Sequence, residues 1–462
     1  MHPKAAAVAD HVSASLDAAI ARLGEYVRFP AISCEPAHAK DVRALAERVK
    51  DDLAKAGLDR SRLHEIDGAH PCVAAEWLDA PGKPTVLIYG HFDVQPVKGE
   101  VWNTPPHELV RKGDRVYGRG SADDMGGWVS HLVAIEAWLK IAGALPCNVK
   151  LLIEGEEEIG SPNLERFMDA FPDAFAADAM ILTDCENPSV DTPGLTTSLR
   201  GLLEVDVTCK SSASDVHSGL WGNIVPDPQL VVVKLVARLI DDDGRMKLGR
   251  RPVDAAWMEQ TRPVSPSRDT VQKGAHLLPG VEPLPERGQS AASWGWRQPA
   301  LTVLSTTFPV PGSEKNAIRA QASMRLSIRI PPGGTREELL ALVTSELTKD
   351  VPGNLQVTIT EHGGASSAWD YVPQGPAFEA ADRAYQKAWG KPLTRVGVGG
   401  SIPFVALFGQ RFSHLPLILN GVIDPQTTAH GPNESMHVGV FAKAMLANVH
   451  LLDELADVKL GR

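Results

Sequence analysis

The sequence has few cysteines, and none of them stands in a metal-binding or redox spacing. The 462 residues include five, namely Cys34, Cys72, Cys147, Cys185 and Cys209. No two of them form a CxxC pair, and an odd number does not complete a disulfide framework. The cysteines therefore indicate neither a cysteine zinc site nor a disulfide scaffold. They favour a reducing compartment, and we expect a cytoplasmic protein.

Long apolar runs and basic clusters are also missing. No stretch approaches the roughly 18 apolar residues of a membrane span, and residues 1–30 are predicted to form an amphipathic helix without the apolar core of a signal peptide. The net charge of -11 comes without a basic run, which argues against nucleic acid or an anionic membrane as a partner. A composition of 43% apolar and 22% charged residues is normal for a soluble globular protein, and the length suggests two domains.

What the sequence does contain is a set of polar residues placed where apolar stretches end. The set comprises His91, Asp93, Asp123, Glu157, Glu158, Asp184 and His430. Hard and borderline cations need several anionic oxygens and neutral nitrogens that converge on one point. Such a set at strand ends is typical of a two-metal hydrolase. Taken singly, each residue could instead be a turn residue or a helix cap, so the hypothesis depends on the combination.

The first two of these residues follow a predicted buried strand over 85–89. His91 and Asp93 are two positions apart, so in an extended chain their side chains share a face. Asp93 can then hold the free imidazole nitrogen and fix the tautomer of His91 that meets a metal. For a lone histidine, a simple turn position would be the better interpretation.

Two pairs of adjacent acids follow. Asp123 and Asp124 stand in a glycine-framed loop ahead of a predicted helix, and adjacent carboxylates resist burial unless a cation neutralises them. The alternative is an acidic helix N-terminus.

Glu157 and Glu158 follow a predicted strand over 149–153. Because neighbours in an extended chain face opposite ways, one can bind a metal while the other stays free as a base. The alternative here is a solvated charged turn.

The hydrophobic pattern changes near residue 197. Before it, strands and helices alternate as in an α/β domain, and after it two long segments alternate apolar and polar residues with period two. The predicted order β-α-β-β-α-β is the split ferredoxin-like unit. This unit lies between candidate ligands, so we expect an inserted domain over 199–373 within a discontinuous domain made of 1–198 and 374–462.

The strand pattern lapses between Gly244 and Pro299. This stretch is rich in proline and holds Trp257, Trp294 and Trp296. It is either an ordered excursion, which could cover a site, or a plain surface loop.

Seven motifs, in order along almost the whole chain, resemble those of the carnosine-dipeptidase and aminoacylase family of di-zinc metallopeptidases, in particular its cytosolic non-specific dipeptidase branch. They are GHFDVQPV, GRGSADDMGG, EGEEEIGS, the Thr-Asp-Cys at 183–185, DVHSGLWGN, GGSIP and AHGPNE. The resemblance implies an α/β catalytic domain of the zinc-exopeptidase type, in which helices flank a mixed sheet. It also implies that the inserted ferredoxin-like α+β domain is a lid and a dimerisation surface.

The resemblance also implies a ligand set. His91, Asp123 and Asp184 would hold one zinc ion, and Asp123, Glu158 and His430 the other, so that Asp123 bridges the two. Two Zn²⁺ per subunit are expected, for which Mn²⁺ or Co²⁺ could substitute. Zinc lowers the pKa of a bound water to about 7 and polarises a scissile carbonyl.

The same resemblance assigns roles around the metals. Glu157 would be the general base, which takes the proton of the water and passes it to the leaving amine. Asp93 would orient His91. The peptide bond between Asp123 and Asp124 is expected to be cis.

Four further residues of the inserted domain and the GGSIP motif are implied as substrate contacts. In the family, the histidine of the DVHSG motif reaches the active site of the partner subunit, so His217 would donate to the developing oxyanion in trans within a homodimer. Arg329, Gly400 and Ser401 would hold the C-terminal carboxylate of the substrate. The alternatives are a turn position for His217 and a solvent-facing strand position for Arg329.

The leading hypothesis is a cytoplasmic di-zinc dipeptidase that cleaves a peptide bond next to a free carboxylate. Dipeptidase members of the family carry a Glu shortly before GGSIP, whereas residues 395–400 here contain no acid, so a free substrate amine is not implied. An N-acyl-amino-acid deacylase, or related amidohydrolase, is the alternative on the same scaffold. A third hypothesis is an inactive dimeric binding module, against which the intact Glu157 argues.

Overall fold

The computed structural model describes residues 2–362, 366–400 and 402–460. The chain forms two compact units. The first comprises Met1–Thr197, Val372–Val396 and Leu407–Arg462, and the second comprises Ser198–Tyr371 and Gly397–Ala406. The domain boundaries expected from the sequence, 199–373 within 1–198 and 374–462, differ from these by one or two residues and also leave 397–406 in the first unit.

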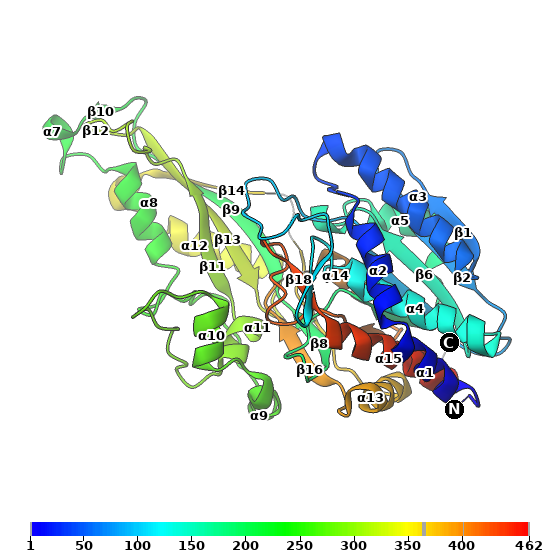
Figure 1. The fold of residues 1–462 in the computed structure, drawn as a ribbon. Coiled ribbons are helices and arrows are strands. Elements are labelled where there is room, and N and C mark those ends of the chain that lie inside the picture. Colours follow the sequence, from blue (N-terminus) through cyan, green and yellow to red (C-terminus); the bar gives the residue numbers. More distant parts are fainter. Residues whose placement is uncertain (1, 363–365, 401, 461–462) are drawn as a thin grey trace. The chain divides into compact units, whose positions relative to one another are not determined.

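The first unit is built on a six-stranded mixed sheet with the order β1-β2-β6-β3-β7-β17. Figure 1 labels β1, β2 and β6 of this sheet. The strands of the sheet are β1 (Asp59–His64), β2 (Cys72–Trp77), β3 (Thr85–His91), β6 (Asn148–Glu154), β7 (Ala179–Leu182) and β17 (Leu417–Leu419). The last four positions in this order are parallel to one another, and β1 and β2 are antiparallel. The parallel strands are almost entirely buried, as expected where helices cover both faces of a sheet.

Helix α4 (Met125–Ala142) is the central helix of this unit. It is apolar on nearly all sides, with Trp128 and Trp138 fully buried, and it packs against β3, α1, α2 and α15. The helices of the unit are α1 (Ala5–Ala14), α2 (Leu16–Val27), α3 (Ala39–Lys55), α5 (Leu164–Ala170), α6 (Pro172–Phe175), α13 (Pro376–Trp389) and α15 (Val438–Leu455), with the short turns η1 (Pro36–His38) and η2 (Glu157–Ile159). Helix α14 (Pro403–Arg411) spans a boundary between the units.

The single helix predicted over 1–30 is wrong, because α1 and α2 are separate helices that meet at Ser15. The Ser15 hydroxyl donates to the carbonyl of His11 at 2.7 Å. A serine that bonds back to its own helix competes with continued helical hydrogen bonding, which explains the break.

Two three-stranded sheets are formed wholly or partly by strands of the first unit. One has the order β18-β5-β4 and the other the order β15-β8-β16. Their strands are β4 (Val110–Lys112), β5 (Arg115–Tyr117), β18 (Ser435–His437), β8 (Gly194–Leu199), β15 (Trp369–Asp370) and β16 (Thr394–Val398). The first of these sheets joins the loop before α4 to the segment before α15.

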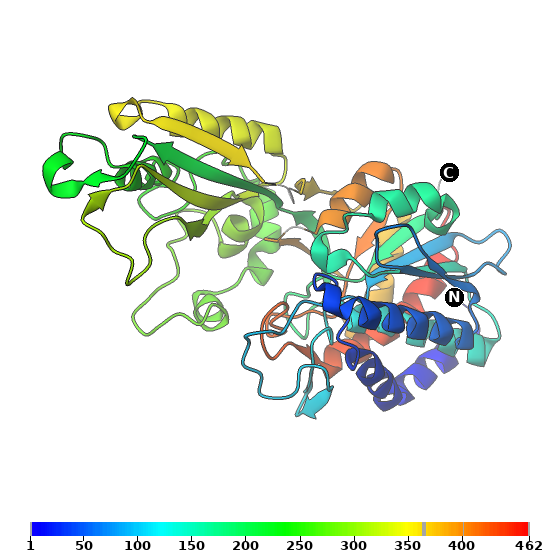
Figure 2. The ribbon, with the colours of Figure 1, turned by 90° about the horizontal axis from the view of Figure 1, so that it is seen from above.

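The second unit has a four-stranded antiparallel sheet with the order β11-β13-β9-β14. Its main elements are β9 (Gly201–Lys210), α8 (Pro228–Ala237), β11 (Ala300–Thr306), β13 (Gln321–Ile330), α12 (Arg336–Thr348) and β14 (Gln356–Glu361), with η4 (Pro352–Asn354) before the last strand. Leu203, Val207, Leu235 and Val343 belong to one core that joins the sheet to α8 and α12. Figure 2 shows α12 lying along the sheet. The predicted fold class, with a ferredoxin-like second domain, is confirmed.

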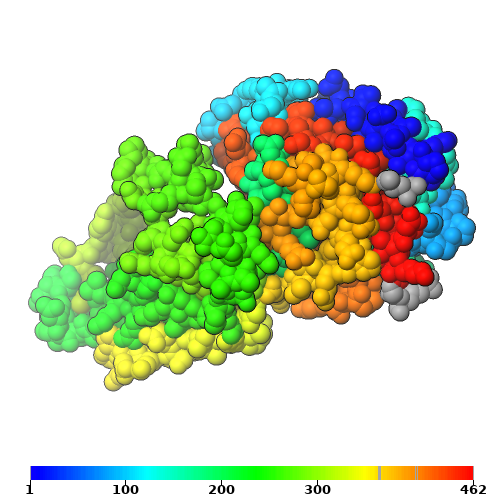
Figure 3. All heavy atoms as spheres, turned by 90° about the horizontal axis from the view of Figure 1, so that it is seen from below, coloured from blue at the N-terminus to red at the C-terminus, as the bar shows by residue number. Residues whose placement is uncertain are grey.

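The stretch between Gly244 and Pro299 is an ordered excursion and not a plain loop. It holds α9 (Ala255–Thr261), η3 (Arg262–Val264), α10 (Arg268–Gly274) and α11 (Ala291–Arg297), and Figure 3 shows much of it, in green, on the surface of the second unit. Trp257 meets Trp296 edge-on with ring centroids 6.2 Å apart. Elsewhere in the unit, β10 (Val216–His217) pairs with β12 (Ala317–Ile318), and α7 (Ser218–Trp221) follows β10. Over the residues that the structure describes, every helix is too short or too polar to cross a membrane.

Candidate active site

Parallel strands bring the candidate residues to one edge of the main sheet. His91 is the last residue of β3, Glu157 and Glu158 follow β6, and Asp184 follows β7. These strands are adjacent and parallel, so their carboxyl ends meet at the same edge. This is the edge at which open α/β sheets bind ligands.

Asp123 stands between two groups of candidate ligands. Its Oδ1 lies 3.1 Å from Nε2 of His91, and its Oδ2 lies 3.1 Å from Nε2 of His430. His430 is also 3.1 Å from Glu158 Oε2. In each of the two groups, His91 with Asp123 and Asp184, and Asp123 with Glu158 and His430, the ligand atoms lie within 4.8 Å of one another. The structure therefore brings all five predicted ligands together, with one residue in common.

The electrostatics of this cluster fit divalent cations. Burial, and then the charge of Asp123, raise the pKa of Asp184 to about 7. Burial, and then the acids Asp184 and Glu158, raise the pKa of Glu157 well above its usual range. Hydrogen bonds with Asp123 and Glu158 raise the pKa of His430 to about 11. Buried carboxylates this close need positive charge, and a set of carboxylate oxygens and imidazole nitrogens suits zinc or a similar metal.

Asp93 fixes the backbone and the ring of neighbouring site residues through hydrogen bonds. Its carboxylate accepts hydrogen bonds from the backbone N–H of Glu157 at 3.1 Å and of Glu158 at 3.0 Å, and from the Ser33 hydroxyl at 2.6 Å. Nδ1 of His91 lies 3.0 Å from the Asp93 carbonyl oxygen and 3.5 Å from its carboxylate. A hydrogen on Nδ1 satisfies this carbonyl, which leaves Nε2 as a lone-pair donor toward the cluster. Asp93 thus orients His91 chiefly through its backbone.

Glu434 is a residue of the site that the sequence did not reveal. It is completely buried, and its two oxygens accept from the backbone N–H of Gly120 at 2.9 Å, Ala122 at 3.0 Å and Asp123 at 3.2 Å. Arg119 donates to it at 3.0 Å. Glu434 therefore holds the loop that carries the shared ligand. The only sequence signal was an acid four residues after His430 in the AHGPNE motif.

Asp124 is enclosed next to the shared ligand. The peptide bond Asp123–Asp124 is cis, as the motif resemblance implied. The Thr183 hydroxyl donates to Asp124 at 2.6 Å. A β-carbon on Gly127 would lie 2.0 Å from one carboxylate oxygen of Asp124, and a β-carbon on Gly90 would lie 2.5 Å from the other. The two glycines thus make room for this buried carboxyl group.

His430 has an unusual backbone. Its φ is 61°, and Thr428 and Asn433 in the same loop have φ values of 58° and 62°. Non-glycine residues are uncommon in this left-handed region, and they often mark functional loops. The turn lets His430 reach Asp123 and Glu158 while its side chain stays 59% exposed, so the second group of ligands is open to solvent.

The remaining predicted site residues belong to the second unit. His217 ends β10 and is exposed, and its Nδ1 accepts from the backbone N–H of Gly219 at 3.0 Å, so Nε2 carries the hydrogen and can donate. Arg329 is half-buried on β13 and lies opposite Ala300 of β11. Gly400 follows β16, and Ser401 lies outside the described residues.

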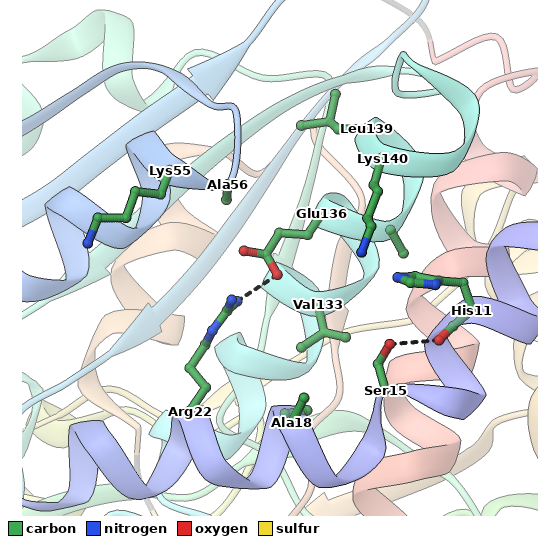
Figure 4. A pocket seen from close by; sticks show the side chains of 12 residues that line it. His11, Ser15, Ala18, Arg22, Lys55, Ala56, Val133, Glu136, Leu139 and Lys140 are labelled. Carbon is green, nitrogen blue, oxygen red and sulfur yellow. Dashed lines mark hydrogen bonds and ion pairs between the residues drawn. The ribbon is translucent and has the colours of Figure 1, made fainter.

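A hollow of about 580 Å³ among α1, α2, α3 and α4 is a different feature of the first unit (Figure 4). Arg22 and Glu136 form an ion pair at 2.7 Å across it, and Ser15 bonds back to His11. The residues that line it include none of the candidate ligands. The hollow is therefore separate from the candidate metal ligands.

Comparison with known proteins identifies the family. Residues 87–454 match the family described as peptidase family M20/M25/M40. The chain belongs to this peptidase family. It is 31% identical to the cysteinylglycine-S-conjugate dipeptidase of Corynebacterium striatum over 87% of both chains, and 28% identical to a Cys-Gly metallodipeptidase of Schizosaccharomyces pombe over 96% of both. Human carnosine dipeptidase 1 has the same fold, with a TM-score of 0.82 at 23% identity over 99% of this chain and all of that one. The family expected from the motifs is confirmed.

Proposed function

We propose that this M20 peptidase is a di-metal dipeptidase that hydrolyses the peptide bond next to a free C-terminal carboxylate. The observation that carries the proposal is the pair of ligand groups that share Asp123. The names of its relatives, which are dipeptidases acting on Cys-Gly and β-Ala-His, support this substrate class. A binding module without activity would not need Glu157 beside these ligands.

The proposed roles of the residues follow from their positions. His91, Asp123 and Asp184 hold one ion, and Asp123, Glu158 and His430 hold the other. Zinc ions held by these residues would supply Lewis-acid chemistry, which lowers the pKa of a bound water and polarises a carbonyl. The set of imidazoles and carboxylates suits zinc, and Mn²⁺ or Co²⁺ can occupy such a site as well.

Glu157 is the proposed general base. Its backbone is fixed by Asp93, and its Oε2 lies 4.0 Å from Nε2 of His91. It is close to the ligand groups but belongs to neither of them. Its carboxylate therefore stays available to take the proton of the attacking water and to deliver it to the leaving amine.

Residues of the second unit are proposed to bind the substrate. Arg329, with Gly400 and Ser401, holds the C-terminal carboxylate, for which a guanidinium offers paired donors. His217 donates from Nε2 to the oxyanion that develops on the scissile carbonyl. The hydrogen bond from Gly219 to Nδ1 supports this role, because it fixes the tautomer that donation requires.

We infer a homodimer in which His217 acts on the site of the partner subunit. The second unit exposes large apolar side chains around α7 and α8, namely Leu220, Trp221, Ile224, Leu230 and Val233. Strand β11 is an edge strand and exposes Val303 and Leu304. Clusters of exposed apolar side chains and unpaired strand edges are features that proteins often cover by association.

The proposed compartment is the cytoplasm. All five cysteines are free, and four of them are buried. Unpaired cysteines are usual where thiols stay reduced. The expected localisation is therefore compatible with the chemistry of the chain.

The test is a substrate panel with the metal-loaded protein. We expect hydrolysis of unblocked dipeptides and no hydrolysis of their C-terminal amides, because the amide has no charge for Arg329. N-Acetyl amino acids test the deacylase alternative, which the names of the relatives do not favour. They are included because the lack of an acid in 395–400 leaves the need for a free substrate amine open. Faster cleavage of acetylated amino acids than of any dipeptide would overturn the proposal in favour of a deacylase.

A further inference from the structure

The second unit contains a cavity between the 244–299 excursion and the start of β11. Its volume is about 610 Å³, which lies in the range of small-ligand sites. Most of its wall is apolar, with Met246, Leu277, Trp294, Trp296 and Leu301 among the lining residues. An apolar group of a ligand would therefore gain by leaving water for this space.

One cation in the wall has no acidic partner among the described residues. Arg200 donates from Nε to the carbonyl of Gly399 at 2.7 Å and from Nη1 to the carbonyl of Gln298 at 3.2 Å. Burial and the neighbouring charge of Arg329 lower its pKa to about 10. The two other arginines in the wall differ, because Arg245 pairs with Asp243 and Arg268 pairs with Glu282. The positive charge left at Arg200 favours an anionic group nearby.

Residues of the cavity wall also contact the glycine loop, by which we mean residues 397–400. A β-carbon on Gly397 would lie 2.7 Å from the β-carbon of Trp296. A β-carbon on Gly399 would lie 2.9 Å from Nη2 of Arg200 and 2.9 Å from the carbonyl oxygen of Gly295. Three residues of the wall, Arg200, Gly295 and Trp296, thus lie against the backbone of this loop.

Arg329 is one strand away from the same cavity. It pairs directly with Ala300 in the register of β13 and β11, and Ala300 lines the cavity. Side chains directly opposite each other on antiparallel strands have β-carbons about 4.5–5.5 Å apart. A carboxylate held by Arg329 and the glycine loop would therefore place the attached side chain within reach of the cavity.

We propose that this cavity is the subsite for an apolar side chain on the C-terminal residue of the substrate. The inference rests on the proposed function, since it takes the C-terminal carboxylate to lie at Arg329 and Gly400. It names a substrate class, which is dipeptides that end in a large apolar residue such as leucine or phenylalanine. Arg200 contributes positive charge at the boundary between the carboxylate and the apolar space.

The test compares kcat/KM for Ala-Gly, Ala-Leu and Ala-Phe. We expect Ala-Phe to exceed Ala-Gly by about 10- to 100-fold, the range that corresponds to burial of one large apolar side chain. Gly295→Leu adds volume at a wall position where a β-carbon meets no atom within 4 Å, so the Ala-Phe to Ala-Gly ratio should fall to within about threefold of unity. Ala291→Leu, at a second wall position, should do the same if the first variant does not fold.

Gly274→Leu is the matched control. Gly274 is an exposed glycine in α10, a β-carbon there also meets no atom within 4 Å, and it does not line the cavity. This variant should keep the wild-type ratio. Cleavage of all three dipeptides without preference for the apolar residues, or an unchanged ratio in a folded Gly295→Leu or Ala291→Leu, would overturn the subsite while leaving the proposed function intact. Cleavage of none of the dipeptides by metal-loaded protein would overturn the proposed function and the subsite with it.

Discussion

Glu434 accepts a hydrogen bond from the backbone N–H of Asp123 at 3.2 Å. The two residues are far apart in the sequence. Glu434 fixes the backbone of Asp123, which is the ligand that both metal groups share. This hydrogen bond joins the loop of His430 to the loop of Asp123. A change in either loop should therefore shift ligands of both metal groups.

Glu434→Ala should weaken metal binding without removing a ligand. The change leaves Arg119 and three backbone N–H groups of the loop without their buried acceptor. Loss of a partner that orients a ligand lowers metal affinity by about 10- to 100-fold, and breaking a buried pair lowers the free energy of unfolding by about 3–5 kcal/mol. Titration with zinc and denaturant unfolding measure both quantities. Wild-type values for both would mean that the loop holds its shape unaided.

Glu157→Gln should separate catalysis from metal binding. Glutamine keeps the size of the side chain but cannot accept the proton, so turnover should drop by about 10²- to 10⁴-fold while the metal content persists. Glu158→Gln is the matched comparison at the next residue, and it should lower the metal content because it removes a ligand. Near-normal turnover of Glu157→Gln would remove this residue from the mechanism.

Complementation tests whether His217 acts in trans. His217→Ala and Glu157→Gln should each be nearly inactive, because both active sites of a homodimer then lack the substituted residue. After dissociation and reassociation of an equal mixture, about half of the dimers carry one site with both wild-type residues, so activity should recover to roughly a quarter of wild type. If subunits demonstrably exchange and no activity returns, His217 acts within its own chain or has no catalytic role.

His131 should make the first unit sensitive to acid. It is buried in α4, and burial lowers its pKa to about 3, below the value of about 6.5 in the unfolded chain. The unfolded state therefore binds a proton first as the pH falls below about 6.5, and stability is lost by up to about 1.4 kcal/mol per pH unit down to the folded-state pKa.

His131→Phe should reduce this loss in the metal-free protein, measured by denaturant unfolding at pH 7.5 and pH 5. His276→Asn is the control, since His276 is exposed and has a φ of 49°, which asparagine tolerates. An identical pH dependence in His131→Phe and wild type would contradict the assignment.

The sequence predicted the parts of the site that follow strand ends. His91, Glu158 and Asp184 could be singled out because each follows an apolar stretch, and the motif resemblance implied how they divide between two metals. Glu434 could not be found in this way, because its role depends on hydrogen bonds to a loop more than three hundred residues earlier. The sequence around Glu434 does not indicate which distant backbone groups it binds.

The excursion shows the same limit. Its tryptophans were visible in the sequence, but the two interpretations could not be separated, since proline-rich segments give no helical period. Its order depends on tertiary contacts, such as Arg245 over the Trp294 ring at 4.3 Å. The cavity beside Arg200 likewise forms where Arg200, the 244–299 excursion and the start of β11 come together. Similarly, the break at Ser15 depends on one side-chain hydrogen bond that an amphipathic pattern does not reveal.

The metal content of Asp123→Ala tests most directly whether one carboxylate serves two metal ions. Because the two oxygens of Asp123 face His91 and His430 separately, we predict two divalent ions per chain in the wild-type protein and the loss of both in this variant. Elemental analysis after equilibrium dialysis against zinc measures the stoichiometry. A single tightly bound ion in the wild type, retained with unchanged affinity in Asp123→Ala, would show that Asp123 is not shared between two metal ions.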